Sequence, residues 1–162
     1  VPTLVIGLFL SDTVEPTGEA GVSFGSSVIM ILLSKLILGV TPLSADFNIQ
    51  LHPVAFAGWV GLFVTAINLF PIGQLDGGHI IYSLFGKKSK NWAKYFFIFL
   101  LSLIYFWPSW GIWAVLLIVI TRFKSAPLLN DDVLPLKKHR KIGYIAIVIF
   151  ILTFVPVPIE VI

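Results

Sequence analysis

The chain consists of apolar runs separated by short polar segments, and the runs have the length of helices rather than strands. The pattern predicts helices over residues 26–38, 54–70, 78–85, 91–106, 109–123 and 142–155. Polar segments at residues 11–25, 39–53 and 126–141 predict loops. The opening "VPTLVIGLFL" is typical of the end of a helix that begins upstream, so we interpret the chain as part of a longer protein.

One apolar run carries a polar break. A single helix from Val54 to Gly86 would be about 50 Å long, whereas the hydrocarbon core of a membrane is about 30 Å thick. Pro71 lacks a backbone donor and nearby glycines weaken helix further, so we expect residues 71–76 to be non-helical. Irregular backbone at membrane depth survives only where it is buried in protein or lines a water-filled cavity. The break therefore predicts a functional site.

The helices expected over residues 91–106 and 109–123 are joined by "WPSWG" and form a predicted hairpin. A hairpin puts both basic clusters of the chain on one side of a membrane, in line with the positive-inside tendency. The clusters are Lys87, Lys88, Lys90 and Lys94, and Arg122, Lys124, Lys137, Lys138, Arg140 and Lys141. We expect both on the cytoplasmic or equivalent side, with residues 11–51 opposite. Trp107 and Trp110 would lie in an aromatic belt at the hairpin tip.

The composition indicates that these helices belong to a membrane protein. Hydrophobic residues make up 57% and charged residues 12% of the 162 residues, and the mean hydropathy is +0.98. A soluble domain carries about 25% charged residues. We therefore expect an all-α fold: a polytopic transmembrane helix bundle with one broken helix at the active site, formed as a single transmembrane domain by residues 1–162. The basic clusters flank apolar runs, which argues for orientation in a membrane and against nucleic-acid binding.

The chain has no cysteine, which excludes disulfides, thiolate nucleophiles and cysteine-based metal sites. Any catalytic chemistry must then come from other polar groups in the apolar runs. The break holds the candidates, because it places a carboxylate, Asp76, among apolar neighbours where a charge is costly.

The spacing Asn68-x-x-Pro71-x-x-x-x-Asp76-Gly77-Gly78 resembles the second signature of the site-2 protease family, the intramembrane zinc metalloproteases. The surrounding "HPVAFAGWVGLFVTAINLFPIGQLDGGHI" is similar to prokaryotic and chloroplast members of that family. The later "PLLNDD" and "LTFVPVP" segments extend the resemblance over most of the chain. The resemblance implies a multi-pass protein of a prokaryotic cell membrane or a plastid membrane.

The resemblance also implies a role for each motif residue. Asp76 would be the third ligand of Zn²⁺, beside two histidines of an H-E-x-x-H helix. That donor set leaves a fourth position for a water, whose pKa zinc lowers to about 7. Asn68 would be catalytic, its amide meeting the scissile peptide or the developing oxyanion. Asn68, Pro71, Gly77 and Gly78 would bind substrate, a locally unwound transmembrane segment of a membrane-embedded protein in the lipid bilayer.

The chain departs from the family at one point, because it contains no H-E-x-x-H motif. None of the glutamates Glu15, Glu19 and Glu160 follows a histidine, and His52, His79 and His139 are too scattered for a helical pair. We expect an upstream part of the same polypeptide to supply that motif. These residues alone should then have no peptidase activity.

Simpler interpretations stand beside these. Asp76 could cap a helix at a membrane surface, His79 could be solvated beside the ligand, and His52 could make hydrogen bonds at a helix start. Lys35 is simplest as a snorkelling cation, and Asp131 and Asp132 as parts of a solvated loop with a possible regulatory role.

Two other functions also remain open. One is an ion- or proton-coupled transporter or channel segment with an intramembrane carboxylate, and the other is a non-catalytic scaffold relative of the protease.

Overall fold

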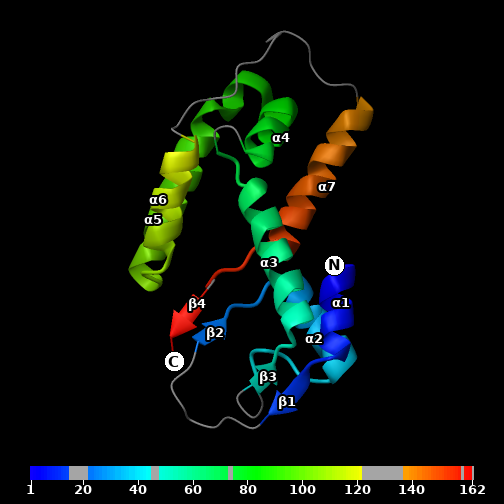
Figure 1. Cartoon of the computed structure of the whole chain (residues 1–162). Coiled ribbons are helices and arrows are strands. Elements are labelled where there is room, and N and C mark those ends of the chain that lie inside the picture. Colours follow the sequence, from blue (N-terminus) through cyan, green and yellow to red (C-terminus); the bar gives the residue numbers. More distant parts are fainter. Residues whose placement is uncertain (15–21, 45–47, 73–74, 122–136, 158, 162) are drawn as a thin grey trace. The chain divides into compact units, whose positions relative to one another are not determined.

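The protein is mostly helical, as a computed structural model shows for residues 1–14, 22–44, 48–72, 75–121, 137–157 and 159–161 (Figure 1). The helices of these residues are α1 (Pro2–Phe9), α2 (Val28–Leu38), α3 (Pro53–Asn68), α4 (Asp76–Phe85), the 3-10 helix η1 (Gly86–Asn91), α5 (Trp92–Phe106), α6 (Trp110–Thr121) and α7 (Lys137–Thr153). The strands are β1 (Asp12–Val14), β2 (Val22–Phe24), β3 (Asn48–Gln50) and β4 (Ile159–Val161). The predicted all-α class is confirmed at this level. In these residues no helix combines the length and the apolar character that crossing a membrane requires.

The chain divides into two compact units. The first unit comprises Val1–Ala66 and Ile151–Ile162, and the second comprises Ile67–Phe150. The candidate residues from Asn68 to Gly78 all belong to the second unit.

In the first unit, α1 packs closely against α3 because glycines stand at the contact. A Cβ atom on Gly7 would overlap the backbone of Ala55, and one on Gly58 would lie 2.6 Å from the Cα of Leu4. Leu4 is fully buried beside this contact. The two helix backbones therefore approach more closely than larger side chains would allow.

Two short antiparallel strand pairs complete the first unit. β1 pairs with β3 with Thr13 opposite Ile49, and β2 pairs with β4 with Ser23 opposite Glu160. The apolar pattern predicted no element at residues 159–161, so the strand β4 there is a new finding. Its physical reason is the alternation Ile-Glu-Val, in which β-branched residues flank one polar residue and favour extended pairing.

An aromatic cluster fixes the segment after β2 onto α3. The indole Nε1 of Trp59 donates a hydrogen bond of 2.7 Å to the carbonyl oxygen of Gly25. The ring of Phe24 lies 4.9 Å from that of Phe56, and Trp59 stacks on Phe63 at 5.5 Å, measured between centroids. The position of β2 therefore depends on one face of α3.

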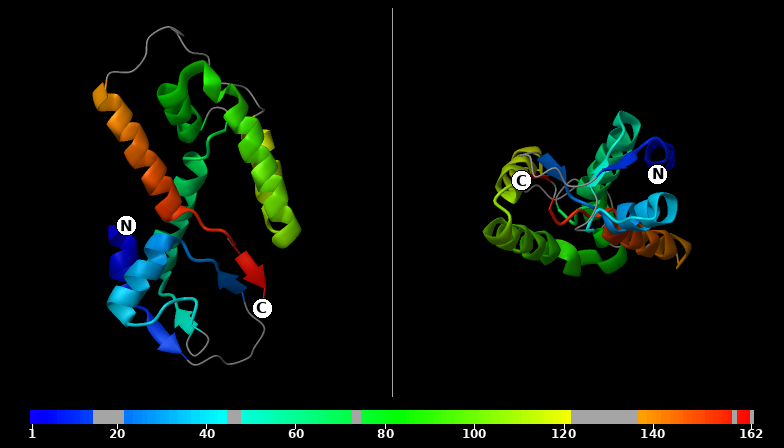
Figure 2. Two further views of the ribbon diagram at one scale, coloured as in Figure 1. Left: turned by 180° about the vertical axis from the view of Figure 1, so that it is seen from behind. Right: turned by 90° about the horizontal axis from the view of Figure 1, so that it is seen from below.

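In the second unit, α5 and α6 pack side by side as the predicted hairpin (Figure 2). The predicted aromatic belt at its tip is wrong for Trp110, which is only 1% exposed. The reason is that Trp110 begins α6 on the face turned toward Phe70, with ring centroids 6.3 Å apart. Trp107, the C-cap residue of α5, is half-buried.

α7 starts at Lys137, five residues before the predicted start at Ile142. The apolar pattern marks only the apolar part of the helix, whereas lysine and arginine are good helix formers and extend it through the basic residues. Four of the six residues of the second basic cluster therefore lie on a helix and not in a loop. Arg122, Lys124, Asp131 and Asp132 lie outside the described residues. The side of a membrane on which each loop lies stays a prediction.

Candidate functional site

The polar break separates α3 from α4, as the sequence predicts. α3 ends at Asn68, and α4 begins at Asp76 after Leu75, which has the extended backbone of an N-cap residue (φ −70°, ψ 156°). The prediction of a non-helical Asp76 is therefore wrong by one residue. An acidic side chain stabilises the first turn of a helix, because it lies at the positive end of the helix dipole. Gly73 and Gln74 lie outside the described residues.

Short-range hydrogen bonds and two buried side chains shape the break. The amide of Phe70 donates to the carbonyl oxygen of Ile67 at 3.1 Å, and the amide of Leu75 donates to that of Ile72 at 3.1 Å. Phe70 and Ile72 are each 1% exposed, and Pro71 is half-buried between them. Because Pro71 has no N–H to donate, it fits a position where no helical bond is made.

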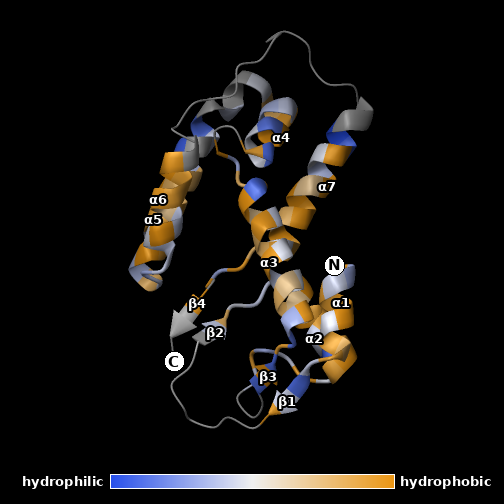
Figure 3. Ribbon diagram, in the orientation of Figure 1, coloured by the Kyte–Doolittle hydropathy of each residue, from blue (hydrophilic) through white to orange (hydrophobic). Residues whose placement is uncertain are grey.

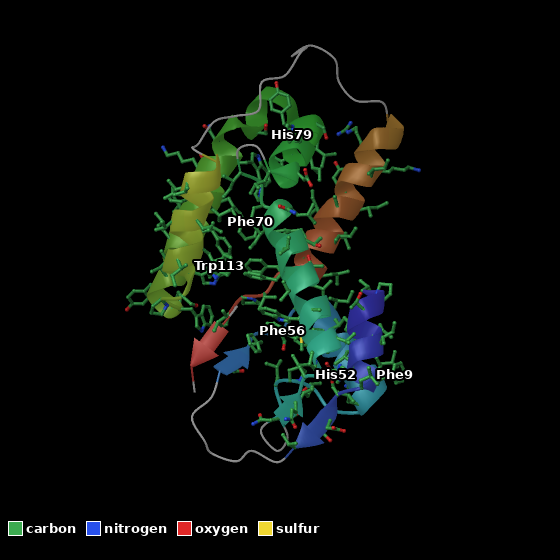
Figure 4. All side chains as sticks on the ribbon, viewed as in Figure 1. Phe9, His52, Phe56, Phe70, His79 and Trp113 are labelled. Atoms are coloured by element: carbon green, nitrogen blue, oxygen red, sulfur yellow. The ribbon has the colours of Figure 1, made fainter. Side chains whose placement is uncertain are left out.

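Phe70 anchors the break to the rest of the second unit. Its ring, labelled in Figure 4, has aromatic neighbours on α5, α6 and α7. It lies 4.9 Å from the ring of Phe96 on α5, 5.7 Å from that of Phe150 on α7 and 6.3 Å from that of Trp110 on α6. No role was expected for Phe70 from the sequence. The available signal was an aromatic residue directly before Pro71 within a polar segment.

Gly77 allows the first turn of α4 to lie against the end of α3. A Cβ atom at Gly77 would overlap the carbonyl oxygens of Leu69 and Phe70. The neighbour of Gly77 in the structure is therefore the chain's own backbone. Gly78 is half-buried in the same turn, and its amide donates to the carbonyl oxygen of Leu75 at 2.9 Å. Substrate binding by Pro71, Gly77 and Gly78 stays a prediction.

Asn68 and Asp76 lie at the two ends of the break, and both are exposed. The backbone contact between Gly77 and Leu69 joins the residues next to them in sequence, so the break brings both ends together. An amide donor and a carboxylate acceptor are thus presented by two helix ends that are packed against each other. The carboxylate also lies at the N-terminal end of α4, where the helix dipole is positive.

The histidines have separate positions. His79 is exposed on α4, three residues after Asp76 (Figure 4). His52 makes hydrogen bonds at the start of α3, as its simpler interpretation predicts: its Nδ1 accepts from the amide of Val54 at 3.3 Å, and its own amide donates to Ser11 Oγ at 3.0 Å. His139 is on the first turn of α7.

A zinc site needs more donors than this part of the chain brings together. Where the structure describes the chain, no three His, Cys, Asp or Glu residues are grouped so that they could hold a metal ion. Asp76 fits one ligand position of zinc, because it is an exposed carboxylate on the first turn of a helix. The remaining ligands would have to come from residues other than those described.

The sequence was compared with known proteins. The profile of peptidase family M50 matches residues 13–105. The chain is 29% identical over 162 residues to "Probable zinc metalloprotease EGY1, chloroplastic" of Arabidopsis thaliana, covering 97% of this chain and 29% of that protein. It is 32% identical over 157 residues to "Probable zinc metalloprotease EGY2, chloroplastic" of the same plant, covering 95% of this chain and 28% of that protein.

A third relative is similar over a shorter stretch of the chain. The chain is 48% identical over 40 residues to "Probable zinc metalloprotease EGY3, chloroplastic" of Oryza sativa subsp. indica, covering 25% of this chain and 7% of that protein. No solved structure matches the chain. The chain spans less than a third of the length of the two Arabidopsis relatives. Since the profile match covers more than half of its residues, the chain belongs to peptidase family M50, the site-2 protease family.

Proposed function

We propose that this chain supplies one part of the catalytic region of a membrane-embedded zinc endopeptidase, which cleaves peptide bonds within transmembrane segments of membrane proteins. The observation that carries the proposal is the pair of exposed polar side chains, Asn68 and Asp76, at the two packed ends of the break. Family M50 membership and the names of the similar zinc metalloproteases support it.

The membrane location in this proposal is supported by exposed apolar side chains. α6 is a 12-residue helix without a charged residue, and its Ile112, Val115 and Val119 are 73%, 61% and 66% exposed. α5 is similarly apolar along most of its length (Figure 3). Side chains of this kind favour contact with lipid or with other apolar helices over contact with water. We propose a multi-pass protein of a plastid or prokaryotic membrane, with the break as its active site.

Each motif residue has a defined task in the proposal. Asp76 would hold zinc together with two histidines from an upstream H-E-x-x-H part of the same polypeptide, whose glutamate would be the general base. Zinc, when bound, would supply a Lewis acid that acidifies water and polarises a carbonyl group. Asn68 would donate from its amide to the carbonyl oxygen of the peptide that is cleaved. Pro71, Gly77 and Gly78 would contact the backbone of an unwound substrate.

Removing the metal tests the proposed reaction. In membranes that contain the full-length protein, a zinc chelator should abolish cleavage of a membrane-embedded reporter, and added Zn²⁺ should restore it, because no other group of the site can replace the Lewis acid. The residues 1–162 alone should cleave nothing in the same assay. Cleavage that persists in protein shown by elemental analysis to hold no zinc would contradict a metallopeptidase.

Replacing Asn68 separates its proposed task from that of Asp76. Asn68→Ala should leave the zinc content unchanged and slow cleavage about 100- to 1,000-fold, the usual cost of removing one oxyanion donor. Zinc content and initial cleavage rates of the full-length variant measure both effects. Thr65→Ala is the matched control, because Thr65 is exposed near the same end of α3 and its Oγ1 donates to the Gly61 carbonyl oxygen within its own helix. A full cleavage rate in Asn68→Ala would rule out the catalytic role, and loss of zinc would show that Asn68 acts on the metal site instead.

A further inference from the structure

The two units differ strongly in charge. The second unit, residues 67–150, holds ten of the 11 lysines and arginines but only three of the eight acidic residues. The first unit holds Lys35 and the other five acidic residues. The net charge of +3 is therefore the sum of a strongly basic second unit and an acidic first unit.

Seven of the ten basic residues of the second unit belong to η1, which follows α4, or to the start of α7. Gly143 on α7 lies against Leu84 on α4, since a Cβ atom at Gly143 would be 2.9 Å from Leu84 Cδ2. Leu84 is two residues before η1, which carries Lys87, Lys88 and Lys90, and Gly143 is two residues after the basic start of α7. One helix contact therefore joins two basic segments that are about fifty residues apart in the sequence.

α7 changes abruptly from charged to apolar. Its first five residues are Lys137, Lys138, His139, Arg140 and Lys141, and no charged residue follows in the helix. Arg140 and Lys141 are exposed. The apolar part that follows is about 18 Å long at 1.5 Å per residue.

One face of this apolar part contacts other residues of the second unit, and the other face is exposed. Gly143 and Phe150, seven residues apart, face Leu84 and Phe70. Ile142, Ile145 and Val148, spaced by three residues, are 59%, 58% and 54% exposed. The exposed apolar residues of α7 thus begin directly after the exposed Arg140 and Lys141.

The positive charge at the start of α7 would be stabilised by bound anions. Cations are unfavourable at the N-terminus of a helix, because the helix dipole is positive there. The first turn of α7 contains no acidic residue, and Asp76 is the only acid in the described part of the second unit. Asp131 and Asp132 precede α7 in the sequence but lie outside the described residues.

We propose that the basic end formed by η1 and the start of α7 binds the headgroups of anionic phospholipids, while the exposed apolar face of α7 lies among their acyl chains. Phosphate groups complement the cations, and the apolar stripe directly below them fits a lipid better than a free phosphate or a nucleic acid. This inference rests on the membrane location proposed above and not on the peptidase reaction.

The test measures lipid binding to the full-length protein in detergent micelles. Phosphatidylglycerol and phosphatidylcholine are titrated separately, and bound lipids are counted by native mass spectrometry. The wild-type protein should bind phosphatidylglycerol at least about tenfold more tightly, because each basic residue near an anionic surface adds to the affinity. The combined variant Lys137→Gln, Lys138→Gln, Arg140→Gln and Lys141→Gln should reduce the preference to about twofold or less. Lys35→Gln, which removes an exposed cation from the first unit, should keep it.

Each other outcome is decisive. Equal binding of both lipids by the wild type, as neutralisation by Asp131 and Asp132 would produce, overturns the headgroup assignment but not the membrane location. Binding of neither lipid contradicts the membrane location itself. If circular dichroism shows that the combined variant does not fold, the salt dependence of lipid binding by the wild-type protein tests the proposal instead. Its preference must fall steeply at about 1 M salt, where the screening length is only about 3 Å, and a preference that salt leaves unchanged contradicts charge recognition.

Discussion

Asp76→Asn in the full-length protein should remove most of the bound zinc and lower cleavage of a membrane-embedded reporter by more than about 100-fold. The variant keeps the size of the side chain but replaces an anionic ligand with a neutral amide, which binds zinc poorly. Loss of groups that only support a ligand already costs about 10- to 100-fold in metal affinity or activity, so loss of the ligand itself should cost more. Zinc content of the purified protein and the cleavage rate give the two measurements.

The fold should survive Asp76→Asn, so the loss can be assigned to the site. Asp76 is exposed, and the N-cap of α4 is Leu75, which makes no side-chain capping bond. Only the interaction of the carboxylate with the helix dipole is lost, at about 0.3–1 kcal/mol. His79→Ala is the matched control, because His79 is also exposed on α4 and has no assigned ligand role; it should keep zinc and most of the activity. If Asp76→Asn retains both zinc and cleavage, Asp76 is not the ligand.

Much of the helical fold could be predicted from the sequence, because it depends on local pattern. The break follows from Pro71 and its glycines, and the α5–α6 hairpin follows from two apolar runs with a short polar join. The start of α7 could not be placed from apolar residues, since its first five residues are basic and helical. β4 was missed for another reason: a three-residue strand exists only through its distant partner, β2.

The candidate site was predictable in its residues but not in its packing. Asp76 could be singled out because a carboxylate among apolar residues is costly and therefore indicates a functional role. The burial of Phe70 and Trp110 depends on how α5, α6 and α7 come together, which no local pattern contains. In the same way, the sequence offers Gly77 as a residue that permits close approach, but only the structure shows that the approaching group is the backbone of Leu69.

Gly77→Ala should therefore disable the site without changing any polar residue. The added Cβ would overlap the carbonyl oxygens of Leu69 and Phe70, and backbone atoms cannot move aside as the tip of a flexible side chain can. Overpacking of this kind costs about 1–3 kcal/mol. Relief requires the first turn of α4 to move away from α3, which carries Asp76 away from Asn68. We expect a lower unfolding temperature, and cleavage reduced about 100-fold, since a displacement of about 1 Å at a catalytic site has that effect.

A glycine with open space around it separates this steric effect from the ordinary effect of alanine in a helix. Gly111 lies in α6 of the same unit, and a Cβ atom there would have no neighbour within 4 Å. Gly111→Ala should leave cleavage unchanged and raise stability by up to about 1 kcal/mol, because alanine has the higher helix propensity. Thermal unfolding of both variants, followed by circular dichroism, gives the comparison. Gly77→Ala with wild-type stability and cleavage would mean that α4 does not lie against the end of α3, and the geometry that joins Asn68 to Asp76 would then be wrong.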